Sequence, residues 1–236
     1  MRPETKQPYF FGVSFLFAPP PALTPGLLLS FQQRLAEPEA GIVFDQVQRL
    51  PAGSAAVHVF TRAAPPLQVT VGQPGPQPLG QLLVVAPQPN RTADDFIDDA
   101  ESVVEVFRET WPGPIQVIRR DCTVRHLYSV REEHAFRYLW AHRLRQPEDA
   151  MREFGRQILG GGLRLVMPAR VDVENDPLLE VKIESLLADP RMLFVETQAV
   201  WEQPLPPGNE PNPRELVEAV EQYADGPVVQ FIMRER

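Results

Sequence analysis

Two short stretches decide the fold, Leu67-Gln-Val-Thr-Val71 and Leu179-Glu-Val-Lys-Ile183, which share one pattern 112 positions apart. In each stretch apolar and polar residues alternate, which predicts a β-strand with one buried face. The apolar segments that follow them, residues 82–85 and 193–196, keep nearly the same offset. We therefore expect the chain to contain one structural unit twice.

Two further echoes occur in the same order along the chain. Phe31-Gln-Gln-Arg-Leu-Ala-Glu-Pro-Glu39 returns as Trp140-Ala-His-Arg-Leu-Arg-Gln-Pro-Glu148, and Gly113-Pro-Ile-Gln-Val-Ile118 returns as Gly226-Pro-Val-Val-Gln-Phe-Ile232. These matches predict two repeats, residues 9–113 and residues 114–236, with a helix inserted in the second near residues 148–159.

Both repeats are expected to run in the order strand, helix, three or four antiparallel strands, helix. Prolines at a first helical position, in Thr24-Pro25 and Asn212-Pro213, mark two helix starts, and the spacing of Ser129 and Glu132 predicts a capping box for a third. Proline-rich connections such as residues 73–78 suit hairpins. The expected strands are residues 10–17, 42–48, 56–61, 67–71, 81–87, 115–130 or its latter part, 163–167, 178–185 and 192–201, and helices begin near residues 24, 94, 129, 148 and 212.

Runs of strands bracketed by helices indicate an α+β class in which helices pack on one face of a curved antiparallel sheet. At the level of element order, this internally duplicated arrangement resembles the TATA-binding-protein-like fold and, more distantly, helix-grip folds. The resemblance implies a sheet that is continuous across both repeats, with helices on its convex side and an open concave face on which a partner sits.

Composition and charge narrow the class of protein. The 236 residues are 43% hydrophobic and 23% charged, close to the average of soluble globular chains. No apolar run reaches the roughly 18 residues of a membrane span, and no secretory signal is recognisable. A single cysteine, Cys122, excludes an internal disulfide and favours the cytoplasm. The net charge of −8 disfavours a general nucleic-acid binder.

Potential metal ligands gather in the middle of the sequence, at Cys122, His126, His134 and His142, with His58 apart from them. On a straight strand Cys122 and His126 are about 13 Å apart, and on one helix His134 and His142 are about 12 Å apart. Neither pair can share an ion that each ligand holds at about 2 Å. We therefore expect no metal and no cofactor, and we expect half-buried histidines on a sheet and a helix.

Nucleophilic catalysis needs a base beside the nucleophile and a group that orients the base. Asp121 would raise the pKa of the Cys122 thiol, whereas neighbouring arginines and His126 would lower it, so a small strand residue and a reactive thiol both stay open. Gly160-Gly-Gly162 follows an expected helix and precedes a strand, the reverse of a phosphate-binding loop, which predicts a helix end and a hairpin entry. No catalytic residue is predicted, and an enzyme is the less favoured class.

Two groups of carboxylates invite a functional interpretation. The first is Asp172, Glu174 and Asp176, and the second is Glu180, Glu184 and Glu196. The first lacks the glycine and the final glutamate of a calcium loop, which predicts an exposed hairpin tip. The acids of the second alternate with apolar residues and share one face with Lys182, which is typical of cross-strand pairing on a sheet with one wet side; a catalytic acid is the alternative.

An arginine-rich segment gives the strongest charge asymmetry. Residues 118–156 hold nine arginines against six acids, whereas the remainder of the chain is acidic. On the expected helix Arg137, His142 and Arg145 fall off the apolar stripe, which makes them the candidate partner-binding residues. They would dock a phosphate, an acidic partner or the acidic remainder of a second copy, with a solvated helix face as the alternative.

These features favour a non-enzymatic protein-interaction module, an adaptor, assembly subunit or inhibitor of a bacterial partner, or a chain that associates with itself. Two alternatives stay open. A small molecule or peptide would bind in a cleft between helix and sheet, and nucleic acid would bind through the central arginine cluster. The aromatic residues that would line such a cleft are Phe15, Phe17, Tyr128, Trp140 and Trp201.

Overall fold

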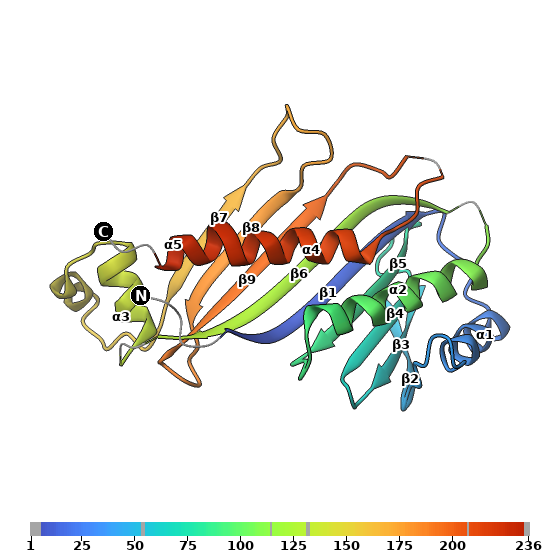
Figure 1. Cartoon of the computed structure of the whole chain (residues 1–236), viewed down its shortest axis with the longest axis horizontal. Helices are drawn as coiled ribbons and strands as arrows, with labels where there is room; N and C mark the ends of the chain where they lie inside the picture. The colour runs from blue at the N-terminus through green and yellow to red at the C-terminus, as the bar shows by residue number, and fades with distance from the viewer. Residues whose placement is uncertain (1–5, 53–54, 114, 131–132, 207, 234–236) are drawn as a thin grey trace.

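A nine-stranded antiparallel sheet forms the centre of the molecule (Figure 1). The computed structural model describes residues 6–52, 55–113, 115–130, 133–206 and 208–233, and in this part of the chain the strand order is β2-β3-β4-β5-β1-β6-β9-β8-β7. The two longest strands, β1 and β6, pair in the middle, so one sheet runs through the whole chain. The strands are β1 (Lys6–Ala18), β2 (Gln46–Ala52), β3 (Ala55–Arg62), β4 (Leu67–Gly72), β5 (Gly80–Pro87), β6 (Gln116–Ser129), β7 (Gly162–Met167), β8 (Leu178–Ser185) and β9 (Met192–Trp201).

The helices that contact the sheet lie on one of its faces, which we call the helix face and which carries Phe11, Val13, Phe15 and Phe17 of β1. Two long helices, α2 (Ala93–Thr110) and α4 (Pro213–Tyr223), run across this face (Figure 1). Helix α1 (Pro25–Leu35) packs on α2, where Phe31 meets the ring of Phe107. The other helical segments are α3 (Ala135–Tyr138), a π-turn at Leu139–Arg143, a 3-10 helix at Glu148–Phe154, a π-turn at Ala224–Val228 and α5 (Val229–Met233).

Helix starts are fixed by side chains that accept hydrogen bonds from free backbone amides. Thr92 and Asp95 form a reciprocal capping box at the start of α2. Asn212 accepts from the Glu215 amide at 3.2 Å at the start of α4, and Thr24 caps α1. The two proline-marked helix starts predicted from the sequence are thus confirmed.

Burial alternates along the strands because only one face is covered. On β5, Leu82 and Val84 are fully buried against the helices, whereas Leu83 and Val85 are half-buried on the opposite face. The buried residues form a large cluster that extends from β4 across the centre to α4 and a smaller one around β8, α3 and α5. Val69 lies in the first cluster and Val181 in the second, so the predicted strand phase is confirmed.

The structure corrects several predicted elements. The strand expected at 42–48 begins only at Gln46, because Ile42 and Phe44 instead turn into the core ahead of it. The helix expected from Ser129 begins at Ala135 and is capped by His134; Ser129 ends β6, and Glu132 lies outside the described residues. The inserted helix is a 3-10 segment that ends at Phe154.

The third sequence echo has no counterpart in secondary structure. Gly113 precedes strand β6, whereas residues 226–232 continue α4 through a π-turn into α5. Pro227 is accommodated there because a π-turn changes the hydrogen-bond spacing around the residue that lacks an amide donor.

The α+β class with an antiparallel sheet is confirmed. None of the helices in the described segments combines the length and the apolarity that a membrane span requires.

Candidate functional site

The face of the sheet opposite the helices, which we call the open face, is apolar on one half. Val59 of β3 and Leu83 of β5 lie on either side of Thr70, and Val85 and Leu16 lie beside them. These side chains are half-buried, and the long helices α2 and α4 pack on the opposite face of the sheet. We call Leu16, Val57, Val59, Leu83 and Val85 the apolar half of the open face.

The other half of the open face carries a ladder of ion pairs. Glu196 of β9 lies between Arg125 and Lys182, with both nitrogen-to-oxygen distances at 2.6 Å. Burial would raise the pKa of Glu196, but the hydrogen bonds from Lys182 and Arg125 outweigh it and hold the pKa below its usual range. Glu180 pairs with Arg164 at 2.7 Å. The predicted cross-strand pairing is thus confirmed, and these two acids stabilise the sheet.

The charges of the open face balance across its strands. Three of the four acids listed here pair with cations of the same face, namely Glu180 and Glu196 as described above and Asp121, which pairs with Arg119 at 2.7 Å. The four cations are Arg119, Arg125, Arg164 and Lys182, and the four acids are Asp121, Glu180, Glu184 and Glu196.

Arg137 and His142 lie on the short helical segment at the outer end of the second half, Arg145 lies just after this segment, and all three are exposed. The His142 ring packs on Tyr138 with ring centroids 5.3 Å apart. Arg145 has a positive φ of 53°, which directs the chain away from the helix after the π-turn. Partner binding by these residues stays a prediction.

The predicted central arginine cluster is not one patch. Arg119 and Arg125 lie on the open face, whereas Arg120 points to the helix face, because side chains alternate along β6. Arg137 and Arg145 lie beyond the end of this strand, and Arg131 lies outside the described residues.

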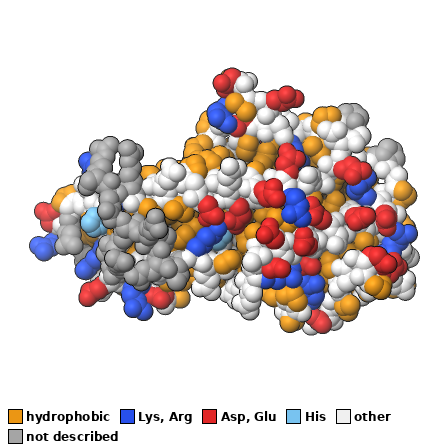
Figure 2. Space-filling view, in the orientation of Figure 1, with side chains coloured by type: hydrophobic (Ala, Val, Ile, Leu, Met, Phe, Trp, Pro, Cys, Tyr) orange, Lys and Arg blue, Asp and Glu red, His pale blue; other side chains and the backbone are white. Residues whose placement is uncertain are grey.

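Acidic side chains gather over α2 and α4 (Figure 2). Arg214 of α4 bridges the two helices by pairing with Asp98 at 3.1 Å and with Glu101 at 2.8 Å. Asp94 and Glu105 of α2 are exposed on the same side of the molecule. The two helices therefore carry an acidic surface.

The thiol of Cys122 is buried on the helix face of β6. Burial raises the pKa of Cys122, and the charges of Glu221 and Asp121 raise it further. His126 on the same strand is also buried, and its Nε2 lies 3.0 Å from Glu221 of α4, which Lys6 contacts at 2.7 Å. The structure therefore favours the small strand residue over the reactive thiol.

Alkylation tests this assignment. In the folded protein at pH 8, Cys122 is expected to react with iodoacetamide at least about 100-fold more slowly than in guanidinium, because the thiolate is disfavoured and covered. Mass spectrometry at timed intervals measures the rates. The control Cys122→Ala with Thr123→Cys moves the only thiol to the open face and is expected to react rapidly. Equally fast labelling of native Cys122 would show that the thiol is accessible.

The remaining histidines are dispersed. His134 accepts from the Phe136 amide at 3.2 Å as a helix cap, and His58 is half-buried on β3. Within the described segments, no three metal-binding side chains gather in one place.

The glycines at 160–162 allow close packing and do not end a helix, since the preceding 3-10 helix stops earlier, with Gly155 in the left-handed conformation. A Cβ atom on Gly161 would meet the Phe136 ring at 2.6 Å, and one on Gly162 would meet the Ile183 carbonyl oxygen at 2.2 Å. The hairpin entry is confirmed, and the helix end is corrected.

The acids at 172–176 lie on the connection between β7 and β8, as predicted for a hairpin tip. Asp176 accepts hydrogen bonds from the Arg170 side chain and backbone amide, which lower its pKa.

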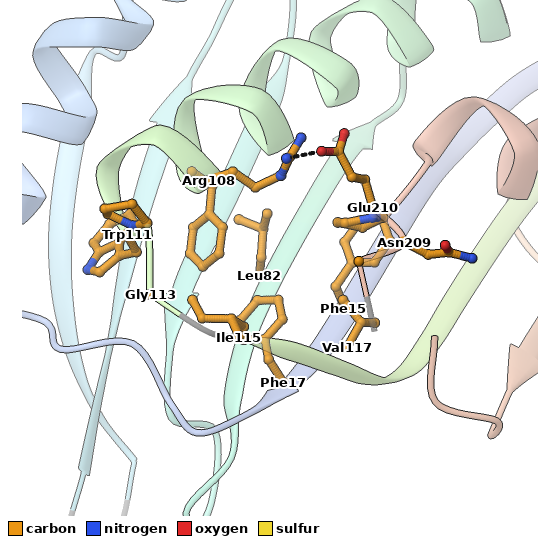
Figure 3. A pocket seen from close by; sticks show the side chains of 14 residues that line it. Phe15, Phe17, Leu82, Arg108, Trp111, Gly113, Ile115, Val117, Asn209 and Glu210 are labelled. Atoms are coloured by element: carbon orange, nitrogen blue, oxygen red, sulfur yellow. Dashed lines mark hydrogen bonds and ion pairs between the residues drawn. The ribbon is translucent and has the colours of Figure 1, made fainter. Parts of the chain in front are cut away.

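A pocket of about 390 Å³ lies between α2 and the chain ahead of α4 (Figure 3). Phe15 and Phe17 of β1 form part of its floor, as the sequence predicts for a helix-sheet cleft, and Trp111 closes one side. Arg108 and Glu210 form an ion pair over its opening (Figure 3). Tyr128 lies in the core, and Trp140 donates to the Pro147 carbonyl.

The apolar half of the open face is missing from the residues predicted from the sequence, although a signal is present. Residues 82–85, Leu-Leu-Val-Val, are apolar at every position, which is typical of a strand with two covered faces. The sequence also signals the buried position of Arg120, because this arginine is in phase with the buried residues Cys122 and Val124.

No protein-family model and no curated protein matches the chain.

Proposed function

We propose that the chain is a non-enzymatic protein-interaction module that binds a protein partner on the apolar half of its open face. The observation that carries the proposal is β5, which is apolar on both faces although helices cover only one of them. Leu83 and Val85 share the uncovered side with Val59, which lies across Thr70 of β4, and apolar side chains that gather on an uncovered face support an interaction site.

A protein fits this surface better than a nucleic acid does. Nucleic-acid affinity rises with the number of cations that neutralise phosphates, whereas every cation listed on the open face is matched by an acid. Apolar side chains beside a polar and charged margin are the usual composition of a protein interface. Such a surface would suit an adaptor, an assembly subunit or an inhibitor of a bacterial partner.

Arg137, His142 and Arg145 support a second contact. They are exposed at the outer end of the second half, whereas α2 and α4 present acids. An acidic partner, or the α2 and α4 surface of a second copy, would complement these side chains and speed association.

We also infer that residues 9–113 and 114–236 are copies of one ancestral unit, as the TATA-binding-protein-like resemblance implies. From the centre outward the strands run β1-β5-β4-β3 in one half and β6-β9-β8-β7 in the other. Strand β4 pairs with β5 as β8 pairs with β9, although Val69 pairs with Val84 and Val181 with Thr197, two residues beyond the Val195 that the sequence echo matches to Val84. Strand β2 has no counterpart among the described residues of the second half.

The pocket under the ion pair of Arg108 and Glu210 makes small-molecule or peptide binding the second candidate function. Its volume of about 390 Å³ lies within the usual range of ligand sites, and apolar side chains form its floor, as is common in such sites.

A paired set of variants tests the proposed function. Val59→Glu with Leu83→Glu places two charges on the apolar half, and Thr123→Glu with Gln198→Glu places the same charges on the charged half of the same face. Proteins retained from the native cell by the wild-type chain are expected to be retained by the second variant and lost, by about 100-fold in affinity, from the first. Thermal unfolding confirms that both variants are folded.

Retention of the same partners by Val59→Glu with Leu83→Glu would contradict the proposal. Salt-sensitive binding of DNA or RNA that disappears in Arg137→Ala with Arg145→Ala would establish the nucleic-acid alternative instead. Light scattering of the purified chain distinguishes self-association from binding of a different protein.

A further inference from the structure

Arg49 and His58 lie side by side at the outer corner of the helix face. Arg49 of the edge strand β2 is directly opposite His58 of β3, and His58 is directly opposite the buried Val71 of β4. Side chains of directly opposite residues share one face of the sheet, with Cβ atoms about 4.5–5.5 Å apart. Two basic side chains therefore meet on this face, the first exposed and the second half-buried.

Arg49 lacks the carboxylate that an arginine at the opposite edge of the sheet has. Arg164 of the other edge strand donates two hydrogen bonds to Glu180, whereas no carboxylate of the described residues lies within ion-pair distance of Arg49. A histidine directly opposite an arginine has a like charge for a neighbour whenever it is protonated, which is unfavourable. Burial and the charge of Arg49 both lower the pKa of His58, so its neutral form is favoured.

Both basic side chains line a pocket of about 550 Å³, which we call the Arg49 pocket and whose volume is within the usual range of small-molecule sites. Apolar side chains around the start of α1 form one wall, and the remaining lining residues, Ala56, Gly72 and Gln73, are uncharged. The apolar residues of the wall are Pro20, Pro21, Leu23, Pro25 and Leu28. Among the described residues that line this pocket there is thus no acid, and Arg49 is the one with a permanent charge.

The charge of the Arg49 pocket favours an anion. A guanidinium matches the oxygens of a carboxylate or a phosphate with two parallel N–H donors, and a protonated imidazole donates from both of its nitrogens. Helix α1 begins at Pro25 in the wall and has no acid in its first turn, so the partial positive charge of its N-terminal end adds to that of Arg49. A cationic ligand would meet only like charge here.

We infer that the Arg49 pocket binds a small organic anion, whose carboxylate or phosphate oxygens contact Arg49 and His58 and whose apolar body packs against the wall around the start of α1. Such a ligand uses both parts of the pocket, whereas an inorganic ion would leave the apolar wall without a partner. The site lies on the helix face and is therefore separate from the proposed protein-binding surface, which lies on the open face.

Binding is coupled to protonation of His58. An anion held between the two basic side chains favours the charged imidazole and offsets the repulsion from Arg49. Among the described residues that are opposite His58 or line the pocket, Arg49 is the only other one with a charged or titratable side chain. The complex therefore takes up a proton on His58, and the affinity for the anion increases as the pH falls from 8 to 6.

Calorimetric titration of the full chain with 2-naphthoate as the probe tests the inference. One saturable site is expected in the wild type, with about 5-fold tighter binding at pH 6 than at pH 8. Arg49→Met is expected to weaken binding about 10-fold or more at both pH values. Arg108→Met removes the exposed arginine that lines the pocket of Figure 3, and this matched control is expected to leave binding unchanged.

His58→Gln separates the coupled proton from the rest of the site. It keeps a hydrogen-bond donor, so it is expected to bind 2-naphthoate at pH 8 within about 2-fold of the wild type and to lose the increase at pH 6. Titration at pH 7 in two buffers of different ionisation enthalpy measures proton uptake, which is expected to reach up to about one proton per site in the wild type and to vanish in His58→Gln. Unchanged proton uptake in this variant would contradict the contact with His58.

Two further variants keep the test decisive whatever the stability of Arg49→Met. Leu28→Trp fills the pocket without changing its charge and is expected to abolish binding. If Arg49→Met does not fold, Arg49→Lys keeps the charge but loses the planar donor pair, and it is expected to weaken binding of 2-naphthoate about 10-fold. Thermal unfolding identifies the variants that are folded.

Matched ligands identify the anionic group. The uncharged 2-naphthylmethanol is expected not to bind. Tighter binding of 2-naphthyl phosphate than of 2-naphthoate assigns the pocket to phosphate esters, and weaker binding assigns it to carboxylates. Absence of binding by both anions, equal binding by 2-naphthylmethanol or by Arg49→Met, or loss of binding in Arg108→Met would overturn the inference. The test is independent of the open face, because Val59→Glu with Leu83→Glu changes the opposite side of the sheet and is expected to retain probe binding.

Discussion

Aspartate at position 69 or 181 is expected to unfold at least the half of the protein that contains it. Val69 is 0% exposed and Val181 is 2% exposed, both on the helix face. A carboxylate there has no partner and must either lose its hydration or become protonated, so the expected cost is about 4 kcal/mol or more. That is a large share of the roughly 5–15 kcal/mol that stabilises an ordinary folded chain. Urea unfolding followed by circular dichroism measures it.

The same substitution on the uncovered side of the sheet is the control. Gln68→Asp and Val166→Asp lie on the open face of β4 and β7, where the aspartate remains hydrated, and each is expected to cost less than about 1 kcal/mol. Comparable losses from Val69→Asp and Val181→Asp would agree with their equivalence in the proposed duplication. Tolerance of either change would mean that the helix face is not a sealed core.

Asp99→Asn is expected to destabilise the protein by about 3 kcal/mol, because it leaves two arginines without their carboxylate. Asp99 of α2 contacts Arg62 at 2.5 Å and also pairs with Arg91, and its side chain is 14% exposed. Asparagine preserves the shape and removes only the charge. The change in the urea midpoint, with an unchanged slope, measures the loss.

The neighbouring Asp98 provides the control for this prediction. Asp98 is 73% exposed and pairs with Arg214 on the surface, so Asp98→Asn is expected to cost no more than about 1 kcal/mol. Arg62→Met combined with Asp99→Asn is expected to recover part of the lost stability, since one of the two unpaired cations is then removed. Equal costs at positions 98 and 99 would show that the buried pair behaves as a surface pair.

Prediction from the sequence succeeded where the spacing of apolar residues along a short segment decides which side chains are buried. Leu67 to Val71 and Leu179 to Ile183 alternate every second position, and both form strands with the predicted buried side. The proline at the start of α4 marks its first turn for a similar local reason. The charged side chains of β8 were expected on a wet face and do pair there with β9 and β7.

Prediction failed where distant contacts decide the outcome. The arginines at 119, 120 and 125 are neighbours in sequence, but the sheet separates them onto two faces with different partners. Ile42 and Phe44 have the composition of a strand, yet they are buried in the core ahead of β2. Helix α3 begins late because His134, which no capping pattern identified, supplies the cap.

The sequence by itself determined the α+β class, most strand positions and the buried side of β4 and β8, because these depend on the spacing of residues a few positions apart. Only the tertiary structure decided that helices cover one side of β5 and leave Leu83 and Val85 uncovered. It also decided that Arg120 is buried with Asn175 as its hydrogen-bond partner. Coverage and pairing depend on contacts between strands and helices far apart in the chain, and no local pattern specifies them.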